Sequence, residues 1–177
     1  ERIVGYKEKD PELYTIIIID HIGLLKRERA FNKKENIDKM SSYLTELRNI
    51  CKFTSVVLSQ FNRELGKVDR LKFSGEELQP IAEDFKDTGA LGEDASMLIA
   101  LFNPTVYSHL DTHLGYNIKK LGKFYRSLHI LASRNTESGV NLSLMMQGKN
   151  GWFHELPKVD EMNDGLYETI KNKMING

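Results

Sequence analysis

The strongest constraint on this chain is a run of four consecutive isoleucines that ends in a carboxylate. Residues 14–21 read Tyr-Thr-Ile-Ile-Ile-Ile-Asp-His, and residues 55–63 form a second apolar run that also ends in polar groups, Ser-Val-Val-Leu-Ser-Gln-Phe-Asn-Arg. Branching at Cβ favours a strand over a helix. Near-continuous apolar runs are typical of parallel strands covered on both faces, so both segments are predicted to be fully buried parallel strands.

The segment between these strands predicts an amphipathic helix. Apolar residues recur at three- and four-residue spacing from Ile37 to Cys51, which indicates a helix over about 36–52, preceded by a polar loop at 26–36. Strand, helix and adjacent parallel strand form one βαβ unit, whose crossover is expected to be right-handed.

The rest of the chain predicts a loop, a helix, a third strand, a hairpin and a tail helix. Glycine and proline indicate a long loop in the polar stretch 62–80, and helix signals return at about 82–92. Residues 96–102 predict a third buried strand, residues 128–134 and 141–147 pair as a hairpin, and the last twenty residues form a tail helix.

Composition excludes several classes of protein. Lys plus Arg and Asp plus Glu are 25 each, so the chain is not a globally basic nucleic-acid binder. A single cysteine cannot form a disulfide framework, which fits a reducing cytoplasm. No apolar stretch is long enough to span a membrane and no signal peptide is present, so no membrane partner is expected. The chain begins at Glu1 without a methionine and is interpreted as a piece of a longer protein.

Polar side chains follow the first two predicted strands at the edge where α/β sheets bind ligands. Asp20 follows the isoleucine run and could orient a magnesium-bound water beside phosphates, because Mg²⁺ keeps its waters and needs few carboxylates. Gln60 could hydrogen-bond a γ-phosphate or the attacking water. The alternatives are an aspartate that caps a turn and a glutamine that faces solvent.

Two further patterns leave their interpretation open. Residues 116–134 mix five basic side chains with aromatic ones and contain no acid, which suits either single-stranded nucleic acid or a solvated subunit interface. His109, Asp111 and His113 have a spacing compatible with a metal, but no third strong ligand is evident, so a metal site there is not expected.

Four motifs occur in a fixed order. They are Ile19-Asp20-His21, residues 56–63 (Val-Val-Leu-Ser-Gln-Phe-Asn-Arg), residues 84–95 (Asp-Phe-Lys-Asp-Thr-Gly-Ala-Leu-Gly-Glu-Asp-Ala) and residues 133–139 (Ser-Arg-Asn-Thr-Glu-Ser-Gly). In this order and spacing the chain resembles the C-terminal motor domain of DnaB-family replicative helicases, bacterial or phage, from about residue 14 to about residue 156. The resemblance implies an α/β fold: a RecA-like P-loop NTPase core with a mostly parallel sheet flanked by helices and a C-terminal antiparallel hairpin.

The resemblance also implies roles for individual residues. Asp20 corresponds to the Walker B aspartate, with Mg²⁺ held through water, and Gln60 to the glutamine that couples nucleotide state to DNA. Arg134 corresponds to an arginine finger that reaches ATP bound by the next subunit of a hexameric ring. The positions that touch the backbone of single-stranded DNA are Lys86, Asp87 and Gly89. A primase or a helicase loader is the further partner implied.

Three departures from the family pattern limit these roles. No Gly-x-x-x-x-Gly-Lys-Ser/Thr occurs in the chain, so it is expected to be a partial domain that lacks the Walker A strand and loop, and to be inactive in isolation. Ala132 stands where many relatives have lysine, and Lys86 stands where they have arginine. Residues 1–157 are expected to form the ATPase portion and residues 158–177 the tail. A RecA-like recombinase or ATPase of another process, and a non-catalytic ring-interaction or DNA-clamping module, are the alternative functions.

Overall fold

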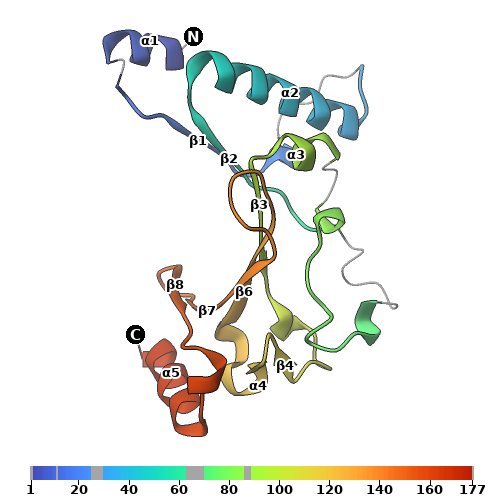
Figure 1. Ribbon diagram of the computed structural model, residues 1–177, viewed down its shortest axis with the longest axis vertical. Helices are drawn as coiled ribbons and strands as arrows, with labels where there is room; N and C mark the ends of the chain where they lie inside the picture. Colours follow the sequence, from blue (N-terminus) through green and yellow to red (C-terminus); the bar gives the residue numbers. More distant parts are fainter. Residues whose placement is uncertain (1, 11, 25–29, 63–69, 86–88, 177) are drawn as a thin grey trace. The chain divides into compact units, whose positions relative to one another are not determined.

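A computed structural model describes residues 2–10, 12–24, 30–62, 70–85 and 89–176 (Figure 1). The chain divides into two compact units. The first unit comprises Glu1–Asn62 and Glu83–Ala95, and the second comprises Arg63–Ala82 and Ser96–Gly177. The chain therefore leaves the first unit after residue 62, contributes residues 63–82 to the second unit, and returns to the first unit at residue 83. The expected boundary between residues 157 and 158 stays a prediction.

The first unit contains the predicted βαβ elements. It is built from α1 (Arg2–Lys9), β1 (Ile16–Ile19), α2 (Lys33–Cys51), β2 (Thr54–Val57) and α3 (Gly89–Asp94). β1 and β2 pair in parallel, with Ile16 opposite Thr54 and Ile19 opposite Val57. Both predicted strands and their parallel pairing are therefore confirmed.

Helix α2 begins three residues earlier than the apolar spacing indicated. The Asn32 side chain accepts a hydrogen bond from Glu35 N at 3.0 Å, and the Glu35 carboxylate accepts one from Asn32 N at 2.7 Å. This capping box satisfies two backbone N–H groups that would otherwise lack partners in the first turn. Residues 33–36, expected in a loop, consequently belong to the helix, and the helix ends at Lys52 in a left-handed conformation with φ of 51°.

The prediction of full burial for the first two strands is wrong. Ile16 and Ile18 are 56% and 68% exposed, whereas Ile17 and Ile19 are half-buried. Successive side chains point to opposite faces of a strand. β1 and β2 form only a two-stranded sheet, and the described residues cover one of its faces in part and leave the other largely open.

The second unit is organised around an antiparallel sheet, so the prediction of a mostly parallel sheet is also wrong. β3 (Met97–Phe102), β6 (Tyr125–Ser133), β7 (Val140–Gln147) and β8 (Trp152–Glu155) lie in that order, and every neighbouring pair is antiparallel. The third strand occurs where it was expected, but its hydrogen-bonding partner is β6, which sequence periodicity cannot reveal. The predicted hairpin is confirmed as β6 and β7.

Shorter elements complete the second unit. They are β4 (Thr112–His113) paired with β5 (Tyr116–Asn117), α4 (Ile118–Leu121) and the C-terminal helix α5 (Asp164–Asn176). Asn117 N donates to the Tyr167 hydroxyl at 3.0 Å, which fastens α5 to the start of α4. Among the described residues, no helix has the length and apolar character that crossing a membrane requires.

The region expected as a loop and then a helix is mostly irregular. Arg70–Lys72 and Ala82–Asp84 are single 3₁₀ turns, and among the described residues of this region only Gly89–Asp94 is α-helical. The first part of the predicted loop, residues 63–69, lies outside the described residues.

Candidate nucleotide and DNA site

Asp20 lies directly after β1, at the carboxyl end of the parallel pair. Two backbone hydrogen bonds extend the pairing past the strand ends: Leu58 N donates to Ile19 O at 2.9 Å, and Ile22 N donates to Leu58 O at 3.1 Å. The Asp20 side chain is exposed, and the next residue, His21, accepts a hydrogen bond through Nδ1 from Gly23 N at 3.1 Å. A carboxylate is therefore presented to solvent on a fixed backbone. Because Mg²⁺ prefers oxygen ligands and keeps its waters, the Asp20 carboxylate is suited to hold the ion through one of its bound water molecules.

Gln60 follows β2 at the same edge of the two-stranded sheet. Since Ile19 lies opposite Val57, Asp20 and Gln60 both extend beyond the last paired residues of adjacent strands. Gln60 is exposed, as is Asp20. The structure thus brings two of the three predicted nucleotide residues, Asp20 and Gln60, to one edge of one unit.

Arg134 belongs to the second unit and lies in the turn between β6 and β7. Its N–H donates to Ser96 O at 3.0 Å, while Ser133 Oγ accepts from Thr136 N at 3.1 Å. These bonds shape the turn, and the Arg134 side chain is exposed.

Of the three predicted DNA residues, only Gly89 can be placed. It is the first residue of α3. Lys86 and Asp87 lie outside the described residues.

A buried network of polar side chains lies in the second unit, where sequence inspection found only a histidine spacing. His113, Ser127 and His129 are 0%, 0% and 1% exposed. His113 Nδ1 lies 2.6 Å from Gly75 O, His113 Nε2 lies 3.0 Å from Ser127 Oγ, and Ser127 Oγ lies 2.8 Å from His129 Nε2. A carbonyl oxygen only accepts, so neutral His113 donates to Gly75 and accepts from Ser127, which in turn accepts from His129.

Burial keeps both histidines neutral. Desolvation, reinforced by neighbouring His113, lowers the pKa of His129 to about 4. Desolvation also lowers the pKa of His113, against the opposing effects of its hydrogen bond to Gly75 and of the Glu76 charge. Both ring nitrogens of His113 have hydrogen-bond partners, and the described part of the chain contains no group of three side chains suited to a metal.

The sequence profile of the DnaB-like helicase C terminal domain matches residues 4–155. The chain belongs to this family. A curated relative, the replicative DNA helicase DnaB of Helicobacter pylori (strain ATCC 700392 / 26695), is 25% identical over 128 residues, which are 71% of this chain and 25% of that protein. The chain thus spans about a quarter of that relative's length.

Solved structures share the fold of this chain. A DnaB-like replicative helicase, described with its interactions with primase, has a TM-score of 0.69 at 20% identity and aligns with 88% of this chain and 34% of its own. A second solved structure, of an ATPase domain, has the same TM-score and identity, and the alignment covers 49% of its chain. The DnaB-like ATPase fold expected from the four motifs is therefore supported, although the four-stranded sheet of this chain is antiparallel and not mostly parallel.

The basic stretch of this DnaB-like chain is largely engaged in internal contacts. Lys119 Nζ lies 2.6 Å from Asp111, and Lys120 Nζ lies 2.5 Å from Asp164. The Arg126 guanidinium donates to Asn103 Oδ1 at 3.1 Å and to two backbone carbonyls. Three of the five basic side chains of the stretch therefore make contacts within the chain.

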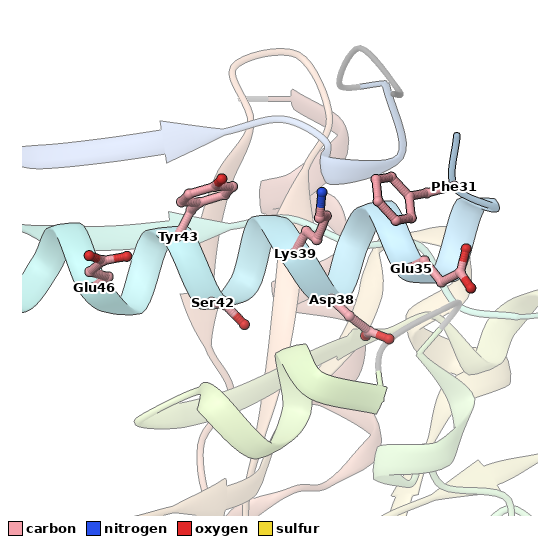
Figure 2. A pocket seen from close by; sticks show the side chains of 7 residues that line it. All are labelled: Phe31, Glu35, Asp38, Lys39, Ser42, Tyr43 and Glu46. Atoms are coloured by element: carbon pink, nitrogen blue, oxygen red, sulfur yellow. The ribbon is translucent and has the colours of Figure 1, made fainter. Parts of the chain in front are cut away.

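A hollow of about 460 Å³ lies along α2 and is separate from the strand ends (Figure 2). Lys39 Nζ lies 3.7 Å from the centre of the Phe31 ring at one end, and Tyr43 lies further along the helix. Neither Asp20 nor Gln60 lines this hollow, so it is not the candidate nucleotide site.

Sequence inspection missed the role of Asn62 and Phe61. Both were part of a quoted motif, but their contacts are with residues 83–85, more than twenty positions along the chain. An asparagine and an aromatic residue directly after a predicted strand were the only local signal.

Proposed function

We propose that this chain is part of the ATP-driven motor of a hexameric replicative DNA helicase, in which ATP hydrolysis drives translocation on single-stranded DNA and unwinding of the duplex. The observation that carries the proposal is the combination of DnaB-like family membership over residues 4–155 with Asp20 and Gln60 at one edge of a parallel strand pair. The assigned cofactors, ATP and Mg²⁺, and the assigned partners follow from the same resemblance, whereas the cytoplasmic location follows from the single cysteine.

In this proposal the residues at the strand ends serve the nucleotide. Asp20 would hold Mg²⁺ through water, and the ion would offset negative charge on the phosphates. Gln60 hydrogen-bonds the γ-phosphate or the attacking water and loses that contact after hydrolysis. The exposed Arg134 acts on ATP bound by the next subunit of the ring, where its planar guanidinium can donate two hydrogen bonds at once.

DNA contact is assigned to the segment that precedes and begins α3. Lys86 supplies a positive charge for a phosphate, and Gly89 lets the backbone approach closely; Asp87 shares this segment. A primase or a helicase loader is the further macromolecular partner in this proposal.

Replacing Arg134 by alanine in the full-length protein tests the function. Arginine fingers contribute about 10³–10⁵ to the rate of phosphoryl transfer, so steady-state ATP hydrolysis should fall at least about 10³-fold. The Kd for a fluorescent ATP analogue should stay within about twofold of wild type, because a finger acts chiefly on the transition state.

Lys149→Ala is the matched control, since Lys149 is an exposed cation in the next turn of the same sheet, at the opposite end of β7. It should leave turnover unchanged. Wild-type turnover in Arg134→Ala would refute the finger assignment. Hydrolysis of ATP without strand displacement on a forked substrate would instead favour the RecA-like ATPase of another process.

A further inference from the structure

Strand β8 forms one edge of the four-stranded sheet in the second unit. Its neighbour on one side is β7, and among the described residues no strand pairs with its other side (Figure 1). An edge strand presents backbone N–H and C=O groups that can pair with a strand of another chain. Which of these groups β8 presents follows from its hydrogen bonds with β7.

The pairing with β7 fixes the backbone groups of β8 that point outward. Leu156 N donates to Ser143 O at 2.9 Å, immediately beyond the last paired residues of the two strands. In an antiparallel pair, residues that exchange hydrogen bonds alternate with residues that do not. His154 therefore bonds toward β7, as Leu156 does, whereas the N–H and C=O groups of Phe153 and Glu155 point away from β7.

β8 lacks several features that protect edge strands in other proteins. Its four residues include no proline and no lysine, and its pairing with β7 runs without a bulge. Trp152 and Phe153 are 63% and 42% exposed. Large aromatic side chains beside an open edge gain from burial against another strand, so β8 is suited to bind one.

The open edge of β8 is complementary to itself. When two copies pair antiparallel about His154, Phe153 of each copy lies opposite Glu155 of the other, and each of these pairs can exchange two backbone hydrogen bonds. In this register both outward-facing residues of each copy are paired. The two Glu155 side chains do not lie opposite each other, so the pairing avoids a direct repulsion between like charges.

We propose that β8 is a self-association surface, to which β8 of a second copy of this chain adds antiparallel and centred on His154. The two four-stranded sheets then become continuous, and the exposed Trp152 of each copy gains Leu156 of the other as its cross-strand neighbour. Such an isologous contact closes after two copies. It cannot build a ring by itself and is therefore separate from the contacts of the proposed hexamer.

A cysteine at the centre of the pairing tests its register. The test uses the full-length protein with Cys51 and any other cysteine replaced by serine. His154→Cys then places the two substituted residues directly opposite each other, in a pair without backbone hydrogen bonds. The Cα atoms of such a pair are about 4.5 Å apart, which a disulfide can span. Mild oxidation should therefore give a covalent dimer on a non-reducing gel.

Trp152→Cys is the matched control in the same strand. Trp152 is exposed whereas His154 is half-buried, so random collisions would crosslink position 152 more readily. In the proposed register, however, residue 152 lies opposite residue 156, so the two copies of residue 152 are roughly 13 Å apart along the strands. This variant should give little dimer, and equal crosslinking at the two positions would contradict the pairing.

Phe153→Pro tests the backbone hydrogen bonds. Proline removes an N–H that points away from β7, so the pairing inside the chain is kept. The twofold symmetry removes this donor twice, and each lost bond is worth about fivefold in affinity. Below the Kd of the pairing, the rate of crosslinking through His154→Cys should therefore fall about 25-fold. Phe153→Leu keeps the N–H and should stay within about threefold of its parent.

Two results would overturn the inference: no dimer with His154→Cys, or an unchanged rate after Phe153→Pro. If Phe153→Pro fails to fold, as judged by circular dichroism, the comparison of positions 154 and 152 decides. Hydrolysis of ATP does not require this contact, so either failure would leave the proposed function intact.

Discussion

Acidification should destabilise the second unit through its buried histidines. His129 is 1% exposed and has a pKa of about 4 in the folded chain, against an ordinary value of 6.5. Between these values the unfolded chain binds more protons than the folded one, so the free energy of unfolding rises with pH across this window. The contribution is complete above about pH 7 and is lost progressively as the pH falls toward 4.

The size of the effect follows from the two pKa values. At pH 5, His129 alone should make the free energy of unfolding about 2 kcal/mol lower than at pH 7.5. Protonation of His129 places a positive charge in a buried site, and a second positive charge on nearby His113 would be repelled. The lowered pKa of His113 acts in the same direction, whereas the Glu76 charge opposes it.

Urea unfolding at pH 7.5 and pH 5 measures this effect. Trp152, the single tryptophan of the chain, lies in β8 of the same sheet and provides the fluorescence signal. Other titrating groups also contribute to the pH dependence. The quantity to compare is therefore the decrease in the free energy of unfolding between pH 7.5 and pH 5 in wild type, minus the same decrease in His129→Gln. That difference should be about 2 kcal/mol. His109→Gln, at an exposed histidine, is the control and should behave as wild type. Equal pH dependence in wild type and His129→Gln would refute the reasoning.

Two further predictions concern the same unit and the activity of the chain. Gly75→Ala would place a Cβ 1.6 Å from the backbone oxygen of Thr112, so residues 74–76 must shift and the His113 contact must break. The free energy of unfolding, measured in urea, should therefore fall by about 2 kcal/mol or more. Gly148→Ala is the control and should be nearly neutral, because a Cβ at that position meets nothing within 4 Å. The isolated 177-residue chain, which contains no Gly-x-x-x-x-Gly-Lys-Ser/Thr, should release no phosphate from ATP above the background rate, and measurable turnover by the pure chain would contradict this expectation.

The properties of neighbouring residues were sufficient to predict several helices and strands. Four adjacent isoleucines and the run around Val56 predicted the two strands, because branching at Cβ favours extended backbone whatever the neighbours are. The apolar spacing from Ile37 to Cys51 predicted α2, although its start depended on the capping residue Asn32. The order of the four motifs was sufficient to indicate the DnaB-like family.

Features that depend on partners distant in sequence could not be predicted. Periodicity does not distinguish a strand covered on both faces from one whose alternate side chains remain exposed, so the exposure of Ile16 and Ile18 was missed. The antiparallel pairing of β3 with β6 depends on hydrogen bonds between segments about thirty residues apart.

The sequence by itself determined where the strands and α2 lie and which side chains follow the first two strands, since these depend on neighbouring residues. Only the tertiary structure decided that His113, Ser127 and His129 form one network, and that Asn62 holds residues 83–84. Hydrogen bonds of this kind have strict distance and angle requirements, and those requirements are met only once the intervening chain has folded.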